Sequence, residues 1–541
     1  MARAYRTQGM HPVEYPVGQW KGLLDTVQPN AAKGNWLTSA YNVWIRDVEL
    51  VGTLVDGRPG FQLLGAQLGE TSKRTVQRIV QFTKASGVST TIAVVGGHVY
   101  SLNWATRAWT EELTPAQITA GGATLSQTVR VYAVTYTDKL ILSDGVNLPF
   151  AWDGTTGAGI TNLSNAAVFY GQPWVYYAKL FGIKNTDRVT IVWSEEGTPN
   201  TGYEAGGYNN AWTIRQTSQD PLVAAAAFND FFLLFRAYSI TPISGAVTTD
   251  FKAQGVREGV SETIGTSSPA GVWVEDDQAY FLGSDRRLYR VGRGEKPTEV
   301  AVGARQALRA ISVSGLANAL VAPWTLGQAV CFGIVGTGYT APSFVVAVDV
   351  HRGACLGIWN GWLMTAWDEV TDADGQPVLL HGGGASSSTS ADGYVYDHGH
   401  PDGSLWQDGF QGGNSPISHE AGFTVGWTPK GVKRFDRLDA GMLLDTNLTG
   451  LTVHWQTPGT TNSGSVVGTI TASGYVYDDP SSQYDTATYA GTAAERAMPV
   501  GLAAEGRWMN CRLAHGLGVE RFRLTGAVVS GMLVDPRPGV Y

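Results

Sequence analysis

Turn-forming residues recur along this chain every 40 to 50 residues, and each turn lies between short runs that favour β-strands. Gly, Asp, Asn and Ser accept the backbone angles of a tight reversal, whereas Val, Ile, Tyr, Phe and Trp favour strands. In residues 280–291, for example, Gly283-Ser-Asp-Arg separates two such runs and predicts a β-hairpin. The turns lie near residues 97, 145, 195, 242, 285, 352 and 393, so the steps, by subtraction, are 48, 50, 47, 43, 67 and 41 residues.

This spacing predicts an all-β fold built around a β-propeller. One four-stranded sheet cannot bury both of its faces, whereas a ring of such sheets buries each face against the next sheet. A period of roughly 40 to 50 residues with several short strands is typical of propeller blades. The repeat is imperfect and fits six or seven blades equally well. The 67-residue step predicts an insertion near residues 305–338.

Tryptophans stand at the ends of several predicted blades, at Trp109, Trp152, Trp193 and Trp359. Strands twist, so the space between neighbouring sheets widens toward their ends. We expect these aromatic side chains to fill that space as core residues.

The segments on either side of the repeats differ from them in pattern. Residues 1–65 contain Pro, Asn and Gly without sustained periodicity and are predicted to be an N-terminal arm that feeds the propeller, which covers residues 66–410. A Gly-, Asp-, Ser- and Pro-rich stretch near residue 410 predicts a boundary. Residues 411–541 alternate apolar and polar side chains in several runs, which predicts a β-sandwich platform domain.

Two arginines of the arm, Arg46 and Arg58, have two interpretations. They are either turn and surface charges, or anchors that fix the arm to the main body or to a neighbouring subunit.

The overall charge argues against tight nucleic-acid binding. The net charge is -8, and a general nucleic-acid binder is expected to be basic. A surface past which DNA slides is still compatible with this balance. The three cysteines, Cys331, Cys355 and Cys511, are too widely spaced for a disulfide framework or a zinc site. We also expect no signal peptide and no membrane-spanning segment, because no apolar run is long enough.

No residue pattern predicts a hydrolase site. Ser143-Asp-Gly and Ser284-Asp-Arg are fragments of the sialidase Asp-box, and turn chemistry explains them better. Glycoside cleavage needs two facing carboxylates. The neighbours Glu195 and Glu196 would point to opposite faces of a strand, and the same holds for Asp276 and Asp277.

One loop contains the best candidate metal ligands. His381, His398 and His400 lie near Asp392, Asp397 and Asp402, and the His-Gly-His spacing can place two imidazoles on one side. The segment is rich in Gly and Ser, so we interpret it as a structural loop, with a divalent ion as the alternative. The prediction is therefore no catalytic residue, no cofactor, no metal and no enzymatic activity.

Four segments resemble the propeller-bearing tail hub, nozzle, tail tubular or DNA-stabilisation proteins of short-tailed bacteriophages. They are Tyr41-Asn-Val-Trp-Ile-Arg-Asp with Gly57-Arg-Pro-Gly; Lys179-Leu-Phe-Gly with Arg188 to Glu196; Ser267-Ser-Pro through Val291; and Val432-Lys-Arg-Phe with Arg521-Phe-Arg-Leu-Thr-Gly-Ala. The likeness covers most of the chain through short, degenerate motifs.

The resemblance implies a structural protein of the virion tail, assembled in the host cytoplasm as a ring, similar to the hexamers of nozzle relatives. It implies portal and adaptor proteins above the ring, tail fibre or spike proteins as further partners, and a lumen through which DNA is retained and then ejected. The alternative is a receptor-binding or carbohydrate-active tail propeller, which would need a cleft with aromatic platforms and paired acids.

Overall fold

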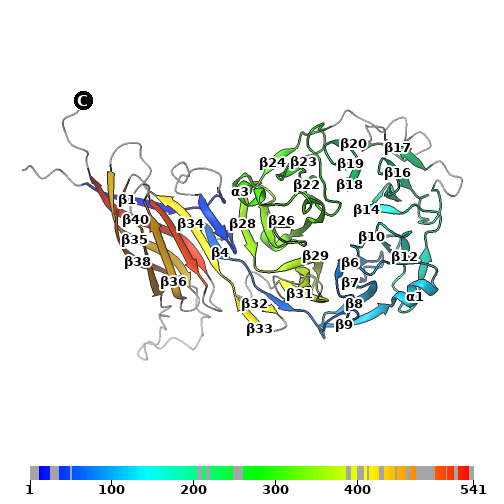
Figure 1. Cartoon of the computed structure of the whole chain (residues 1–541), viewed down its shortest axis with the longest axis horizontal. Coiled ribbons are helices and arrows are strands. Elements are labelled where there is room, and N and C mark those ends of the chain that lie inside the picture. Colours follow the sequence, from blue (N-terminus) through cyan, green and yellow to red (C-terminus); the bar gives the residue numbers. More distant parts are fainter. Residues whose placement is uncertain are drawn as a thin grey trace, which may run out of the picture.

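The computed structural model describes residues 11–24, 36–48, 52–203, 210–214, 220–247, 251, 260–384, 392–398, 407–410, 413–425, 432–444, 448–457, 463–470, 494–506, 509–516 and 522–534. Strands form nearly all of the regular structure, and a ring of sheets lies beside a second group of longer strands (Figure 1). The few helices are short and include α1 (Pro115–Ala120) and α3 (Arg305–Arg309). Within this part of the chain, no helix has the length and apolar character needed to cross a membrane.

Seven antiparallel sheets of the described residues form the ring, and we number them as blades one to seven in chain order. Blade one contains β6 (Val76–Thr83), β7 (Ser89–Val95), β8 (His98–Asn103) and β9 (Ala108–Leu113). Blade two contains β10 (Tyr132–Tyr136), β11 (Lys139–Ser143), β12 (Phe150–Trp152) and β13 (Ile160–Asn162). Blade three contains β14 (Phe169–Tyr176), β15 (Lys179–Lys184), β16 (Thr190–Trp193) and β17 (Ala211–Thr213). Blade four contains β18 (Leu222–Ala227), β19 (Phe231–Arg236) and β20 (Ile240–Ser244).

The remaining three blades follow the same pattern. Blade five contains β21 (Val272–Glu275), β22 (Gln278–Leu282), β23 (Leu288–Gly292) and β24 (Thr298–Val300). Blade six contains β25 (Leu320–Trp324), β26 (Ala329–Ile334), β27 (Phe344–Asp349) and β28 (Cys355–Asn360). Blade seven contains β29 (Leu363–Thr371), β30 (Pro377–Gly384) and β31 (Tyr394–His398), and its fourth strand is β5 (Phe61–Leu63) from the N-terminal arm.

The ring closes between the last blade and the first. The first strands of successive blades pack side by side around the axis, and β29 returns to β6. Thr365 Oγ1 donates to the Val76 carbonyl at 2.7 Å, and Arg78 pairs with Asp368 at 3.0 Å. The predicted all-β propeller is confirmed, and seven is its blade number.

The predicted insertion at residues 305–338 was largely wrong. Only residues 301–319, which include α3, lie outside the blades there, because β25 and β26 are the first two strands of blade six. The 67-residue step arose because the turn near 285 joins second and third strands, whereas the turn near 352 joins third and fourth strands. Counted between their first strands, which begin at residues 76, 132, 169, 222, 272, 320 and 363, the blades are 37 to 56 residues apart by subtraction.

Both ends of the chain build the sandwich. One sheet contains β3 (Val43–Val48), β4 (Gly52–Gly57), β40 (Arg523–Val534), β35 (Val432–Leu444) and β38 (Ala494–Gly506), with β1 (His11–Gly18) also paired to β40. The other contains β2 (Leu37–Tyr41), β34 (His419–Val425), β39 (Met509–His515), β36 (Leu448–Gln456) and β37 (Ser463–Ile470). The residues of the predicted arm are thus shared between the two sandwich sheets and blade seven. Two strands around residue 410, β32 (Gln407–Phe410) and β33 (Gly413–Pro416), extend the sheet of blade seven.

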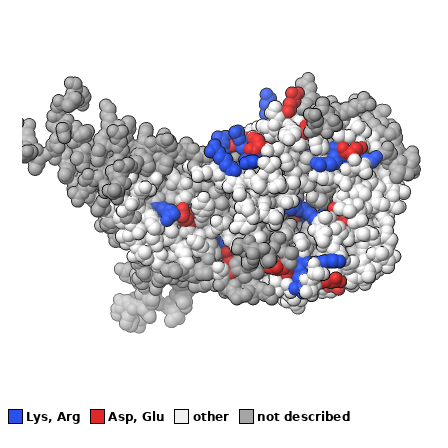
Figure 2. Space-filling view, viewed as in Figure 1, with Lys and Arg blue, Asp and Glu red and all other residues white. Residues whose placement is uncertain are grey.

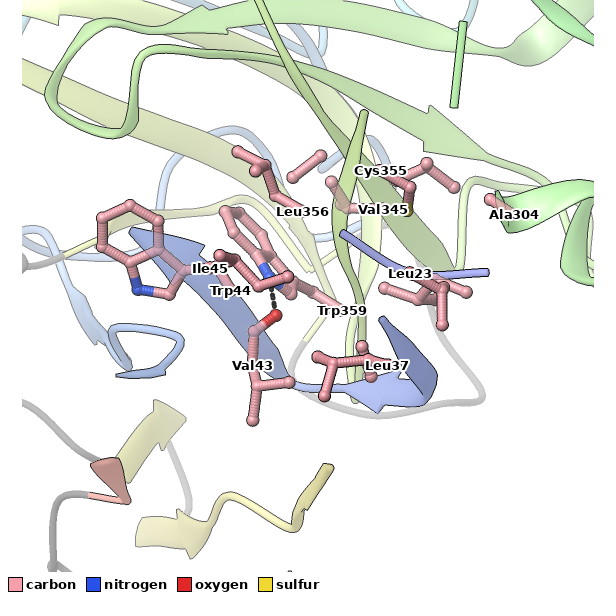
Figure 3. Packing of buried hydrophobic residues seen from close by; sticks show 14 of the residues in the cluster. Leu23, Leu37, Val43, Trp44, Ile45, Ala304, Val345, Cys355, Leu356 and Trp359 are labelled. Atoms are coloured by element: carbon pink, nitrogen blue, oxygen red, sulfur yellow. Dashed lines mark hydrogen bonds between the residues drawn. The ribbon is translucent and has the colours of Figure 1, made fainter. Parts of the chain in front are cut away.

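One sheet runs without a break from the propeller into the sandwich. The strand β2 pairs in parallel with β28 of blade six and antiparallel with β34, which gives nine strands in a single sheet. The arm lies directly on β28 because residue 357 is glycine: a Cβ there would be 1.9 Å from the Val43 carbonyl oxygen. A second contact joins the same two elements: the Trp359 indole donates to the Val43 carbonyl at 3.1 Å, the hydrogen bond drawn in Figure 3.

The largest hydrophobic cluster spans blades five to seven and both sandwich sheets. Trp152, Trp193 and Trp359 are buried, as expected of core residues, and Trp109 is half-buried and donates to the Leu64 carbonyl.

Candidate functional site

Arg58 is the centre of a buried polar network between the propeller and the sandwich. Its side chain is 1% exposed, and its guanidinium binds both carboxylate oxygens of Asp408, at 2.8 and 2.6 Å. Arg58 also donates to the Asn360 carbonyl at 3.2 Å and lies over the Trp362 ring, 4.4 Å from the centroid. Arginine suits this position because its planar fork matches a carboxylate and its face stacks on aromatic rings.

Asn42 connects this network to two further elements. Its Oδ1 accepts from Arg58 Nε at 3.0 Å and from the Asn360 backbone N–H at 2.8 Å. Its Nδ2 donates to Asn360 Oδ1 and to the Ser418 carbonyl, both at 2.9 Å. Asn42 has a left-handed backbone with φ of 53°, a conformation that asparagine adopts more readily than most residues. The side chain therefore ties the end of β28 to the residue that precedes β34.

The two arginines of the arm have different roles. Arg58 fixes the arm to the main body, in agreement with the second interpretation of its charge. Arg46 pairs with Asp56 at 3.0 Å, and both residues belong to the β3–β4 hairpin. Arg46 is thus a charge within the arm.

Histidines line the propeller side of the junction. His381 Nδ1 and His398 Nε2 are 2.8 Å apart, and both rings are buried against Phe61 and Trp362. Burial lowers the pKa of His381 well below its ordinary value and that of His398 to about 3, and the nearby Arg58 charge acts in the same direction. Both imidazoles are therefore neutral at physiological pH.

The candidate metal ligands were interpreted as part of a structural loop, but His381 lies on β30, and Asp397 and His398 lie on β31. Asp397 accepts from Gln62 at 3.2 Å and from Arg107 at 3.0 Å, and Asp392 precedes β31. His400 and Asp402 lie outside the described residues. Among the residues that the structure describes, no group of three His, Cys, Asp or Glu side chains could hold a metal ion.

A second histidine pair lies on the sandwich side. His419 is fully buried, and its ring stacks on Phe522 and His515, with centroids 5.9 and 6.2 Å away. It fits there because residue 57 is glycine: a Cβ at Gly57 would be 2.7 Å from His419 Nε2. Burial lowers the pKa of His419 well below its ordinary value, so this ring is also neutral.

The candidate acids do not form a facing pair. Glu195 binds Lys179 at 3.3 Å and Asn210 at 2.9 Å, whereas Glu196 is exposed. Hydrogen bonds from Asn210 and Lys179 lower the pKa of Glu195. Asp276 and Asp277 are the exposed two-residue turn between β21 and β22.

The Asp-box fragments serve turns. Asp144, which follows Ser143, accepts from the backbone N–H groups of Val146 at 2.9 Å and Asn147 at 2.7 Å. Ser284 contacts Ser267 at 2.9 Å. The cysteines are free thiols in the core, and burial raises the pKa of Cys331 and Cys511.

A groove of about 650 Å³ lies on the outer face of the sandwich. Its lining is mainly polar and includes Ser39, His454, Gln456, Asn510 and Arg512. Arg512 pairs with Glu420 at 3.3 Å, and Trp455 lines the groove while packing against the core. None of the described residues that line the groove is a carboxylate, so among them there is no pair for glycoside cleavage.

Sequence reasoning singled out Arg58 but missed Asn42, Asn360 and Asp408 as its partners. Asp408 is 350 positions from Arg58 and lies in a stretch that was interpreted as a boundary. No local pattern marks such a partner. The only available signal was the general need of a buried arginine for a carboxylate.

Comparisons with known proteins leave the family open. No protein-family model and no curated protein matches the chain. Similar solved structures include the WD40 β-propeller domain of Doa1 (11% identity, 63% of this chain and 96% of that one, TM-score 0.37). They also include BamB from Moraxella catarrhalis (13%, 65% and 95%, 0.37) and the C-terminal WD40 domain of Sif2 (12%, 67% and 95%, 0.36). Because these scores are low, the propeller assignment rests on the sheets and their packing.

Proposed function

We propose that this chain is a structural protein of a phage tail, a ring-forming hub or nozzle that docks below the portal and adaptor. In this role it retains packaged DNA, forms the channel for genome ejection and carries fibre or spike proteins. Its role is mechanical rather than enzymatic, with no cofactor. It acts in the virion tail after assembly in the host cytoplasm, as a hexamer by analogy with nozzle relatives.

The observation that supports this proposal most is the continuity between propeller and platform. The nine-stranded sheet joins blade six to the sandwich, and Arg58 binds Asp408 across the same junction. A part that transmits force between an adaptor and a fibre needs such coupling, whereas domains that move independently share small polar interfaces. The segments that resemble tail proteins at residues 41–47 and 57–60 build this junction.

The propeller axis cannot be the DNA path. Arg130 precedes blade two, Asn318 precedes blade six, and Arg130 donates to the Asn318 carbonyl at 3.1 Å. These blades are not neighbours in the ring, so the hydrogen bond crosses one end of the axis. An opening that one arginine side chain spans is too narrow for a duplex, since the major groove of B-DNA alone is about 12 Å wide. In the proposed function the lumen must therefore lie between copies of the chain.

The test combines the mass and the shape of the assembled protein. Light scattering on the purified full chain should give a closed oligomer, and negative-stain images should show a ring with an opening wide enough for a duplex. A polysaccharide-cleavage assay on the same sample addresses the alternative. A monomer or trimer that cleaves glycan would reject the nozzle and favour a carbohydrate-active tail propeller.

A further inference from the structure

One end of the propeller is acidic. The seven turns between first and second strands lie at the same end, because the first strands of the blades pack side by side around the axis. Ala85 N–H donates to Asp138 of the next turn at 2.5 Å, and Thr325 N–H donates at 2.6 Å to Glu369 near the end of β29. These turns contain one basic residue, Lys84, and six acidic residues: Asp138, Asp230, Asp276, Asp277, Asp372 and Asp374. Asp230 is paired with Arg293 at 2.5 Å. Within these seven turns the other five aspartates outweigh Lys84 and give the turns a negative excess.

The opposite end carries a cluster of arginines on blade five. Arg286 and Arg287 lie in the turn between β22 and β23, and Arg305 and Arg309 lie on α3. Figure 2 shows basic side chains gathered where Figure 1 labels α3. Glu299 binds Arg287 at 3.5 Å and Arg305 Nε at 2.5 Å. Arg286 donates to the Arg309 carbonyl at 3.4 Å, and the ion pairs among described residues give neither of these two a carboxylate partner.

Exposed apolar side chains accompany both charged ends. Near the arginines, Val302 is 38% exposed, Val313 is 70% exposed and Tyr238 is 58% exposed. Tyr238 is close because the neighbouring Ala237 carbonyl accepts from Ser284 at 2.5 Å. At the end that carries the acidic turns, Val88 is 59% exposed and Tyr177 is 46% exposed, each on a neighbouring turn without an acidic residue. Arginine and tyrosine beside apolar residues are typical of protein–protein contacts.

We propose that the arginine end of one copy docks on the acidic turns of the next copy. A nucleic acid is the other anionic partner that these arginines could attract. A long nucleic acid would extend past the arginines over the rest of a chain whose net charge is -8, which repels phosphate, whereas the acidic end of a second copy would contact only the arginine end. The two surfaces differ, so the contact is head-to-tail and continues from copy to copy until a ring closes. This inference rests on the ring of the proposed function and identifies the surfaces that form it.

Charge reversal at each end tests the contact. Arg286→Glu with Arg309→Glu reverses the basic end, and Asp277→Lys with Asp374→Lys reverses the acidic end. Each pair should weaken self-association by about 10-fold or more, measured by mass photometry over a dilution series. The chain with all four substitutions should associate again, because its ends are complementary once more. Arg512→Glu, on the outer face of the sandwich, is the matched control and should leave association unchanged.

Mixing the two reversed proteins gives a second, sharper result. In the mixture the two native ends are complementary to each other, and so are the two reversed ends. Association should therefore return with the two variants alternating, and any closed ring should contain equal numbers of each. A third readout needs no variant: raising NaCl from about 0.05 to 0.5 M should weaken wild-type association, since the Debye length shortens. Circular dichroism checks that each variant is folded. If a variant does not fold, the salt dependence of wild-type association still tests the contact.

The outcomes separate this contact from the proposed function. If the protein forms a ring whose association is unchanged by charge reversal and by salt, the proposed contact is rejected but the ring of the proposed function is not. Open filaments that dissolve on reversal would support the contact and reject the closed nozzle. A monomeric wild type would reject both. If that monomer retained a labelled DNA duplex through Arg286 and Arg309, the arginines would be a nucleic-acid surface instead.

Discussion

At the scale of residues, the Arg58–Asp408 pair shows how burial makes one charge depend on another. Replacing one partner leaves the other charge in a water-poor site, so Arg58→Ala or Asp408→Asn should destabilise the protein by about 3–5 kcal/mol. Arg512→Ala is the control, because Arg512 is 49% exposed and pairs with Glu420 on the surface. That change should cost about 1 kcal/mol or less. Chemical denaturation of the three variants measures the difference, and equal losses for Arg58 and Arg512 would contradict the buried network.

The buried histidines predict acid sensitivity. The pKa of His398 falls to about 3 in the folded state, so between that value and its ordinary 6.5 the unfolded chain binds more protons. Stability should therefore fall as pH decreases below 6.5, by up to about 1.4 kcal/mol per pH unit for each such proton. His398→Gln keeps a side chain that can hydrogen-bond to His381 but cannot titrate.

The measurement for this second prediction is the free energy of unfolding at several values between pH 4 and pH 7. The slope for His398→Gln should be shallower than that of the wild type. Identical slopes would show that another group governs the acid response.

At the scale of elements, hairpins were predictable because their signals are local. Gly283-Ser-Asp-Arg does join β22 and β23, and Gly96-Gly97 joins β7 and β8. Pairings between distant segments were not predictable, because β5 reaches β31 across more than 300 residues and its three residues carry no distinguishing pattern. For the same reason the sequence showed the alternation in residues 451–455 but not that the sandwich takes strands from both chain ends.

One hairpin carries a correctable strain. The turn between β14 and β15 is Tyr177-Ala178, and both residues have positive φ, 46° and 52°. Two-residue turns of this kind favour glycine at the second position, because a side chain raises the energy of the left-handed region. Ala178→Gly should stabilise the protein by about 1 kcal/mol, seen as a higher denaturation midpoint.

Ala85→Gly is the control for this third prediction. Ala85 lies in an exposed turn without a positive φ, so glycine there adds only freedom to the unfolded chain and should lower the midpoint. If the two substitutions changed stability in the same direction, the strain at Ala178 would not be the cause.

At the scale of the whole molecule, the junction makes the propeller and the sandwich depend on each other. The N-terminal arm supplies strands to both, and the largest hydrophobic cluster extends through both. The same N-terminal arm gives β1 to β4 to the sandwich and β5 to blade seven, so the strands of the two parts are connected through one segment. A mechanical role in a tail would use this coupling, since a load on the platform reaches blade six through the continuous sheet.

This coupling predicts a single calorimetric transition for the wild type. Domains with their own cores and small interfaces usually unfold separately, whereas here the last strand of blade six continues into the sandwich. Asn42→Ala removes hydrogen bonds from Asn42 to Asn360 and Ser418 while leaving both cores in place. It should broaden or split the transition, whereas the surface change Arg512→Ala should shift nothing but the midpoint. Two well-separated transitions in the wild type would mean that the sheet joins the parts without coupling their stability, and the mechanical argument for the nozzle would then lose its support.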